Sequence, residues 1–339
     1  MGSLTLITGG AGFVGSNAAA DMARRGERVR ILDNLSRRGT ERNLEWLRRN
    51  WGDRIEFVKG DVRDAGAARR AVEGAGLILH LAGQVAVTTS VEDPRPDFEV
   101  NALGTFNVLE AARLSGARPA FIVSSTNKVY GGMEDLEVVE EETRCRFAGG
   151  IAAVSEERPL DFHSPYGCSK GAADQYVRDY ARIYGLPTVV FRMSCIYGPR
   201  QFGNEDQGWV AHFLISGAKG RPVTVYGNGK QVRDILYVDD LIRAFRAAAE
   251  RIRSVQGRVY NIGGGERNTL SLMELIEIMR REFGYAVKPS YAKWRPGDQP
   301  IYVSDIRRAR EDLGWEPAVG RDEGIRLLRD WIESQKPNL

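Results

Sequence analysis

Two side chains in the middle of the sequence, Tyr166 and Lys170, have a spacing that allows them to act together on a proton. The stretch after Pro165 is rich in helix formers, and residues four apart lie one turn apart on the same helix face. A free tyrosine has a pKa of about 10 and is a poor base at neutral pH. A nearby ammonium group favours the phenolate and lowers that pKa, so the pair suits proton exchange with a sugar hydroxyl. The same spacing also occurs on ordinary helix surfaces.

A group of hydroxyl side chains, which includes Ser124 and Thr126, ends a predicted strand about forty residues before Tyr166. A hydroxyl at this strand end would face the same cleft as Tyr166. It can hydrogen-bond the substrate oxygen on which charge develops during hydride transfer. Serine and threonine at strand ends are often simple turn residues, so the position of this group before Tyr166 is what favours a role in catalysis.

The first predicted strand ends in a glycine-rich turn with Gly9, Gly12 and Gly15 at three-residue spacing. Glycine permits the tight turn and lets backbone N–H groups approach a pyrophosphate at the N-terminus of the helix that follows. Glycines are also ordinary turn residues, but this turn follows a strand and opens a helix, which is the context that a dinucleotide site requires. The sequence therefore predicts a dinucleotide cofactor.

The second predicted strand ends in Asp33, eighteen residues after Gly15. An acid at this point can accept hydrogen bonds from both adenosine ribose hydroxyls, and its charge repels a 2′-phosphate. NAD is therefore expected rather than NADP. Arg37 and Arg38 follow closely and leave NADP open, because an arginine can hold a 2′-phosphate; we favour a solvated loop for them.

Further strand ends are predicted to face the cofactor, because ligands of such sheets bind outside the carboxyl ends of the strands. Asp61 would meet the adenine, and Gly83 would let the backbone approach the cofactor. Asn101, at the start of a long predicted helix, is either a helix cap or an active-site hydrogen-bonding group, and we favour the cap.

Alternating apolar runs and helical patterns predict a Rossmann-type α/β fold with a doubly wound parallel sheet. Residues 1–193 are expected to form the cofactor-binding domain, and 194–339 mainly a smaller substrate-binding domain. Residues 234–262 are expected to return to the first domain as a helix over Asp234–Ala249 and a strand over Val259–Ile262. The other predicted strands are Leu4–Thr8, Arg28–Asp33, Ile55–Lys59, Leu77–Leu81, Ala120–Ser124 and Thr188–Arg192, and the predicted helices include Phe13–Arg25, Asn101–Ser115, Tyr166–Tyr184, Leu272–Phe283 and Asp322–Glu333.

Composition is that of an ordinary globular protein, with 339 residues, 27% charged residues and a net charge of +3. The charge is not clustered and no apolar run is long enough to span a bilayer, so we expect neither a nucleic-acid nor a membrane surface. The N-terminus enters a strand without a signal peptide. Three scattered cysteines and three histidines without ligand spacing indicate a reducing cytoplasm and no metal site.

The ordered set of motifs resembles the extended short-chain dehydrogenase/reductases that act on nucleotide sugars, over nearly the whole chain. The matching segments are the glycine turn, Asp33, Asp61-Val62, Leu81-Ala82-Gly83, Thr126, Tyr166-x-x-x-Lys170, Tyr197-Gly198-Pro199-Arg200 and Arg233-Asp234.

This resemblance implies an NAD-dependent enzyme that forms a homodimer or homotetramer, with Thr126, Tyr166 and Lys170 as catalytic residues. Arginine can clamp a diphosphate; Arg233 is favoured for this role, whereas Arg295 is equally well a surface charge. Substrate contacts are expected from Gln84, Thr126, Asn127, Gln201, Arg233 and Arg295. Cofactor contacts are expected from Gly9, Gly12, Phe13, Val14, Gly15, Asp33, Asn34, Ser36, Arg37, Asp61, Val62, Leu81, Ala82, Gly83, Asn101, Ser124, Tyr166 and Lys170.

Within the family, the segments around Thr126, Tyr166 and Gln201 are most similar to epimerases that invert C2 of a CDP-linked deoxyhexose through a 2-keto sugar. Dehydratases of the family carry an Asp-Glu pair where this chain has Asn127-Lys128, so elimination of water lacks its usual acid and base. Many relatives have an asparagine where this chain has Cys195. An epimerase that acts at C4 or on a UDP-, GDP- or dTDP-sugar remains open, as does a non-catalytic NAD-binding sensor.

Overall fold

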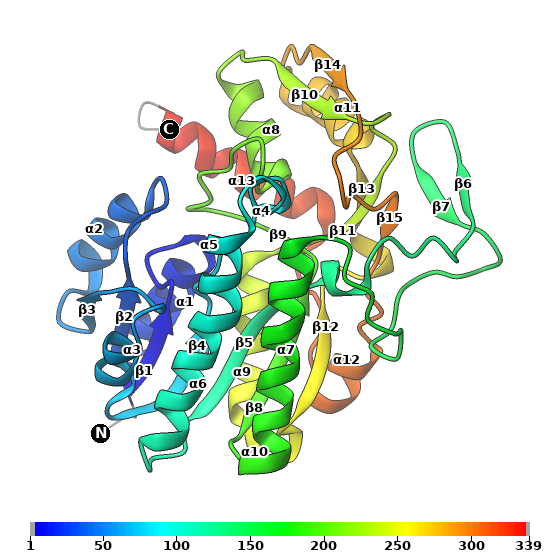
Figure 1. The fold of residues 1–339 in the computed structure, drawn as a ribbon. Coiled ribbons are helices and arrows are strands. Elements are labelled where there is room, and N and C mark those ends of the chain that lie inside the picture. The colour runs from blue at the N-terminus through cyan, green and yellow to red at the C-terminus, as the bar shows by residue number, and fades with distance from the viewer. Residues whose placement is uncertain (1–3, 337–339) are drawn as a thin grey trace.

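A parallel sheet of seven strands forms the centre of the molecule, in the order β12-β8-β5-β4-β1-β2-β3 (Figure 1). The computed structural model describes residues 4–336, so the outermost residues of both predicted domains lie outside it. The strand order reverses between β1 and β4, and the crevice at such a reversal is where ligands bind. The predicted doubly wound α/β fold is confirmed. The strands are β1 (Leu4–Thr8), β2 (Val29–Asp33), β3 (Ile55–Lys59), β4 (Ala75–His80), β5 (Ala120–Thr126), β8 (Thr188–Met193) and β12 (Arg258–Ile262).

Helices cover both faces of this sheet because successive strand residues point to opposite faces. Leu6 and Ile7, for example, are both fully buried but belong to different core clusters. One face carries α1 (Phe13–Arg24), α2 (Thr40–Trp51), α9 (Val238–Glu250), α10 (Ile252–Val255) and α12 (Arg307–Leu313). The other carries α3 (Ala65–Val72), α6 (Gly104–Leu114) and α7 (Pro165–Tyr184).

Two small sheets and three helices lie at the carboxyl end of the large sheet (Figure 1). Here the sequence-based prediction was partly wrong: the helix expected from Asp234 begins only at Val238, because Val232–Tyr237 form a strand in which Asp234 is fully buried. The helix α9 and the strand β12 do pack on the large sheet. The other elements are β9 (Cys195–Tyr197), β10 (Val223–Tyr226), β11 (Val232–Tyr237), β13 (Thr269–Ser271), β14 (Pro289–Ala292), β15 (Ile301–Tyr302), α8 (Trp209–Ala218), α11 (Leu272–Phe283) and α13 (Arg321–Gln335).

Several short elements lie between the large ones. A π-helical turn, η1 (Glu99–Leu103), precedes α6, so Asn101 lies inside continuous helical backbone and the interpretation of this residue as a helix cap is wrong. Within residues 4–336, none of the helices has the length and apolar character needed to cross a bilayer. The remaining short elements are α4 (Val87–Glu92), α5 (Pro94–Phe98), the 3₁₀ turns η2 (Asn127–Tyr130) and η3 (Glu266–Asn268), and the hairpin of β6 (Val138–Glu140) and β7 (Cys145–Phe147).

Candidate active site

The first turn of α7 and the end of β5 bring Tyr166, Lys170 and Thr126 together. The helix begins cleanly, because the Ser164 hydroxyl accepts a hydrogen bond from the Gly167 N–H at 3.0 Å and Pro165 occupies the first helical position. All three side chains are buried, and Tyr166 is hydrogen-bonded to Thr126. The Lys170 ammonium donates to the Ser124 carbonyl. The predicted trio therefore lies on facing elements of one cleft.

Burial dominates the charge state of this trio. It raises the pKa of Tyr166 to about 12; the hydrogen bond with Thr126 opposes this rise, the negative charge of Asp97 adds to it, and the positive charge of Arg37 opposes it. Burial also lowers the pKa of Lys170 to about 8. The net shift of the Tyr166 pKa is upward because desolvation outweighs the neighbouring charges, and the lowering by Lys170 stays a prediction.

The glycine turn has no room for side chains. Gly9 has a φ of +69°, and a Cβ on it would lie 2.8 Å from the Ala82 nitrogen. A Cβ on Gly15 would lie 2.4 Å from the Gly9 oxygen. The helix α1 starts at the N-cap Gly12 without a side-chain cap, so its first N–H groups are open to a ligand. An anion such as a pyrophosphate fits this place.

Asp33 closes the far end of the same cleft. Its two carboxylate oxygens accept hydrogen bonds from the backbone N–H groups of Ala11, at 3.0 Å, and Leu35, at 2.8 Å. Burial raises its pKa, whereas both backbone donors lower it. These bonds fix the carboxylate at the end of β2 with further lone pairs free, which suits two vicinal ribose hydroxyls.

A single cleft of about 740 Å³ connects Asp33, the glycine turn and Tyr166 with the loops around Gln201 and Arg295. Every residue that the sequence predicted for cofactor or substrate lines it, apart from Asn101 and Lys170. These two lie directly behind the wall: a Cβ on Gly83 would be 3.1 Å from Asn101 Oδ1 and 3.8 Å from Lys170 Nζ. The structure thus gathers residues from the whole chain around one space.

The substrate end of the cleft contains charges that the sequence did not single out. Asp298 lies between Arg233, at 2.7 Å, and Lys128, at 3.4 Å, and Lys128 also donates to the Gly297 carbonyl. Gln299 accepts a hydrogen bond from Asn127 at 3.0 Å. Lys128 and Asp298 are 170 residues apart in the sequence, so no local pattern indicates that they meet.

Arg295 is held at the cleft by the segment Phe202–Gln207. It donates to the Glu205 carbonyl at 2.9 Å, pairs with Asp206 at 3.3 Å and stacks 3.8 Å from the ring centre of Tyr226. Thr88 donates to the same Asp206, at 2.9 Å. Because Arg37 also donates to Gln207, this segment reaches both sides of the cleft.

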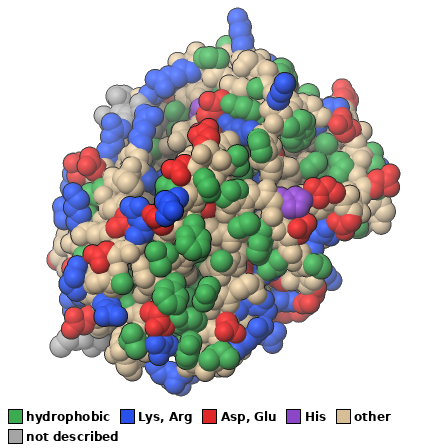
Figure 2. Space-filling model, viewed as in Figure 1, with side chains coloured by type: hydrophobic (Ala, Val, Ile, Leu, Met, Phe, Trp, Pro, Cys, Tyr) green, Lys and Arg blue, Asp and Glu red, His purple; other side chains and the backbone are tan. Residues whose placement is uncertain are grey.

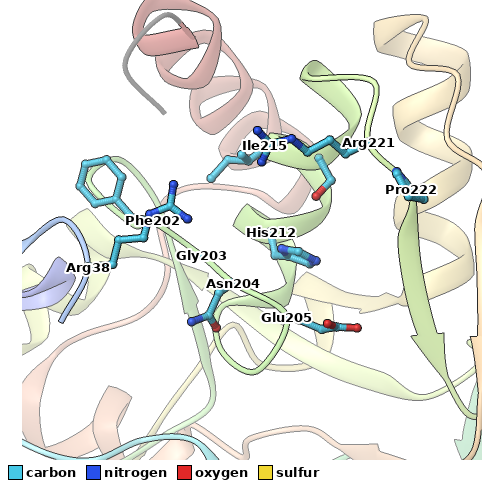
Figure 3. A pocket seen from close by; sticks show the side chains of 10 residues that line it. Arg38, Phe202, Gly203, Asn204, Glu205, His212, Ile215, Arg221 and Pro222 are labelled. Atoms are coloured by element: carbon cyan, nitrogen blue, oxygen red, sulfur yellow. The ribbon is translucent and has the colours of Figure 1, made fainter.

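A second cavity of about 340 Å³ lies behind the Phe202–Glu205 segment, with His212 and Ile215 entering it from α8 (Figure 3). Arg38 lines this second cavity, whereas Arg37 lines the main cleft. None of the three catalytic candidates borders the second cavity. Thr126 and Tyr166 line only the larger cleft.

The glycine turn, Asp33 and the Tyr166 pair are the arrangement found in a known family. A family model described as GDP-mannose 4,6 dehydratase, one of the short-chain dehydrogenase/reductases that act on nucleotide sugars, matches residues 6–328. The chain belongs to this family. A CDP-paratose 2-epimerase from Salmonella typhi is 44% identical over 336 residues, covering 97% of this chain and 99% of that protein.

Solved structures of the family have the same fold. A UDP-glucose 4-epimerase from Thermotoga maritima, solved with UDP-glucose, has a TM-score of 0.85 at 31% identity and covers 98% of this chain and 99% of its own. A UDP-glucose 4-epimerase from Thermus thermophilus, solved with NAD, has a TM-score of 0.81 at 35% identity and covers 97% and 99% of the two chains. This short-chain dehydrogenase/reductase is therefore an enzyme of the nucleotide-sugar epimerase and dehydratase type.

Proposed function

We propose that this enzyme uses NAD to invert C2 of a CDP-linked deoxyhexose, converting CDP-paratose to CDP-tyvelose. The observation that carries this proposal is the 44% identity, over nearly the full length of both chains, to the Salmonella typhi CDP-paratose 2-epimerase. The NAD-bound structure of the Thermus thermophilus relative supports the cofactor. The open N-terminus of α1, the crowded Gly9 and Gly15, and the fixed Asp33 carboxylate all fit that dinucleotide.

The side chains at Asn127 and Lys128 favour epimerisation over dehydration. Loss of water needs an acid and a base beside the sugar, and here the two positions after Thr126 hold an amide and an ammonium group. Both are already engaged, Asn127 with Gln299 and Lys128 with the Gly297 carbonyl and Asp298. Neither side chain is a carboxylate, so neither offers the base that would remove a carbon-bound proton.

In the proposed mechanism, Tyr166 takes the proton of the C2 hydroxyl as a phenolate, and Thr126 holds the same oxygen as it becomes a carbonyl. NAD, which the glycine turn and Asp33 would hold, would supply the hydride acceptor and donor for C2 when bound. Lys170, whose ammonium group donates to the Ser124 carbonyl behind the cleft wall, would hold the nicotinamide ribose. Tyr166 later returns the proton to the alkoxide on the opposite face of C2.

Inversion requires the keto sugar to turn over while the nucleotide stays bound. Arg233 and Arg295 border the cleft beyond the reaction centre and can clamp the diphosphate through forked hydrogen bonds. Both now bind carboxylates, Arg233 with Asp298 and Arg295 with Asp206. We propose that the diphosphate replaces or shares these partners, so the sugar is free to rotate on a fixed anchor.

Two alternatives to this function would be detected by the experiment described below, an epimerase that acts at C4 and a non-catalytic NAD-binding sensor. The similarity to UDP-glucose 4-epimerases favours inversion at C4 as the second candidate. A non-catalytic sensor has no need for the buried Tyr166 and Lys170 together.

We further propose that the enzyme works in a reducing cytoplasm, because its three cysteines, Cys145, Cys168 and Cys195, are all unpaired.

The decisive experiment offers the enzyme a panel of CDP-, UDP-, GDP- and dTDP-sugars and determines product stereochemistry by NMR. Inversion at C2 of the CDP-sugar is expected, and inversion at C4 alone would refute the assignment. Substrate deuterated at C2 should keep its label in ordinary water, because the same hydride returns to the carbon. Loss of the label to water would instead indicate removal of the C2 hydrogen as a proton.

A further inference from the structure

A buried carboxylate, Asp97, lies behind the reaction centre and has no part in the mechanism above. It comes from the short helix α5 and is 1% exposed. Ser169 donates its hydroxyl proton to one carboxylate oxygen, and Asn101 Nδ2 approaches the other at 3.2 Å. Asn101 Nδ2 is also 3.1 Å from Ser169 Oγ, so the three side chains form a closed triangle. Burial of a carboxylate is costly without such donors.

The triangle is connected to both walls of the active-site cleft. Ser169 directly precedes Lys170 on α7. Asn101 accepts a hydrogen bond from the Gln84 N–H at 2.9 Å and donates to the Gln84 carbonyl at 3.1 Å. It does so from the π-helical turn η1, and such turns are frequent at functional sites. Asp97 therefore holds the groups that position Lys170 and the Gly83-Gln84 segment.

Charged or titratable groups act on Lys170 from three elements: Asp174 on its own helix, His80 on β4 and Asp97 on α5. Arg37, which follows β2, acts on Tyr166 and opposes the effect of Asp97 there. Asp174 is neutralised by Arg192, which donates to both of its oxygens at 2.8 and 3.1 Å. Burial lowers the pKa of His80 to about 3, so His80 is neutral near pH 7. In the described part of the chain, the hydrogen-bonding partners of Asp97 are uncharged. Burial raises the pKa of Asp97, and the Ser169 hydrogen bond, the charge of Lys170 and the Asn101 hydrogen bond oppose this rise. Unlike Asp174, the Asp97 carboxylate has no arginine paired with it among residues 4–336.

We propose that Asp97 is a positioning residue for proton transfer, which anchors Asn101 and Ser169 and places a negative charge beside Lys170 and Tyr166. The proposal rests on the roles given above to these two residues. A negative charge favours the protonated form of every neighbour, so Asp97 raises the pKa of Lys170 and of Tyr166. It thereby keeps Lys170 an ammonium ion against the cost of burial.

Replacement of Asp97 should therefore shift the whole pH–activity profile. Both limbs report the coupled titration of Tyr166 and Lys170 in the buried site, so neither limb belongs to one residue alone. In Asp97→Asn both limbs should move to lower pH, by about one unit for a buried charge at this range. A uniform loss of activity without a shift in either limb would show a structural role only and would overturn the proposal.

Glu99→Gln is the matched control, because it removes one negative charge from the adjacent turn. Glu99 pairs with Arg63 and Arg95 on the outer side and does not touch Ser169 or Asn101. The pH–activity profile of Glu99→Gln should have both limbs at the same pH as the wild type. Asp97→Glu should restore the wild-type limbs, since it returns the charge. If Asp97→Asn does not fold, Asp97→Ser provides the same test with a smaller side chain.

A second readout does not depend on the substrate. The Lys170 pKa can be followed in the purified enzyme by NMR of ¹³C-labelled lysine, with the signal assigned from Lys170→Arg. It should be lower in Asp97→Asn than in the wild type. An unchanged value overturns the proposal about Asp97, whereas a shifted value together with no C2 epimerisation refutes only the assigned reaction.

Discussion

At the scale of single residues, the proposed reaction centre is a pair of buried groups whose charged forms are both disfavoured by burial. The Tyr166 phenol, with a pKa of about 12, resists losing its proton, and the Lys170 ammonium, with a pKa of about 8, is close to losing its own near neutral pH. Each is therefore sensitive to the next charge that arrives in the cleft. Protonation states that respond to nearby charge suit a site in which a proton must leave and return within one turnover.

Replacement of Tyr166 by phenylalanine tests the proton carrier directly. The change removes one hydroxyl and little volume, so the fold and the binding of NAD should persist. Turnover should fall by about 10²–10⁴-fold, the usual contribution of general acid–base catalysis. Initial rates on the best substrate of the panel, with bound cofactor measured in parallel, provide the comparison. Near-normal turnover would remove Tyr166 from the mechanism.

Asp33 and Arg37 favour different cofactors, NAD in the case of Asp33 and NADP in the case of Arg37. The Asp33 carboxylate is fixed by two backbone donors, and its charge repels a 2′-phosphate, whereas the Arg37 guanidinium reaches across the cleft to Gln207. We expect NAD(H) to be released when the purified protein is denatured, because both hydride steps of the proposed mechanism use one bound molecule. Mass spectrometry of the supernatant decides, and reproducible recovery of NADP would refute this role of Asp33.

At the scale of elements, the buried His80 connects three segments of the cofactor domain. Its ring nitrogens lie 2.8 Å from the Thr8 hydroxyl at the end of β1 and 2.9 Å from the Thr105 hydroxyl on α6. Burial, with a smaller contribution from Lys170, lowers its pKa to about 3. The ring therefore joins β1, β4 and α6 as a neutral group.

This depressed pKa makes stability depend on pH in a defined window. In the unfolded chain the imidazole takes a proton below about 6.5, whereas in the folded protein it stays neutral down to about 3. Stability is thus lost as the pH falls through this window, by at most about 1.4 kcal/mol per pH unit. The free energy of unfolding can be measured with denaturant between pH 4 and 6. Its dependence on pH should be weaker in His80→Asn than in the wild type, by the equivalent of about one bound proton.

The control for this measurement is Thr105→Val, which removes the hydroxyl's hydrogen bonds with His80 and with the Asn101 carbonyl but keeps the titrating ring. It should cost on the order of 1 kcal/mol at every pH and retain the wild-type slope. Equal slopes in His80→Asn and the wild type would show that His80 does not remain neutral in the fold.

Local pattern was enough to predict the strands and the glycine turn but not the polar groups behind them. The runs that form β1 and β3 are bounded by turn residues, so their ends were predicted correctly. Asp97 meets Ser169 only because α5 packs on α7, and Asp298 meets Lys128 across more than half of the chain. Such contacts depend on tertiary packing and carry no periodic signal. Asn101 was misjudged for the same reason, since a π-helical turn has no distinct sequence pattern.

At the scale of the whole molecule, α6 and α7 have apolar side chains that the described chain does not cover. Figure 2 shows hydrophobic side chains gathered on the face formed by these helices. Phe106 on α6 and Tyr176 on α7 are 38% and 50% exposed and contact each other edge to face at 6.0 Å, and Ile183 is 67% exposed. A patch of this kind on two adjacent helices is typical of a contact with another protein surface.

We propose that this patch joins two copies of the chain about a two-fold axis, which places four helices in the interface. Light scattering at micromolar concentration should give twice the mass of one chain. The double variant Phe106→Arg/Tyr176→Arg should be monomeric, because burial of each large apolar side chain is worth about 1.5–3 kcal/mol and the axis doubles every change. The dimer Kd should therefore rise by well over about a hundredfold. Leu327→Arg, at an apolar side chain of α13 that is 41% exposed, is the matched control and should remain dimeric. A wild-type protein that is monomeric at this concentration would contradict the proposal, and a dimer that survives the double variant would place the interface on another face.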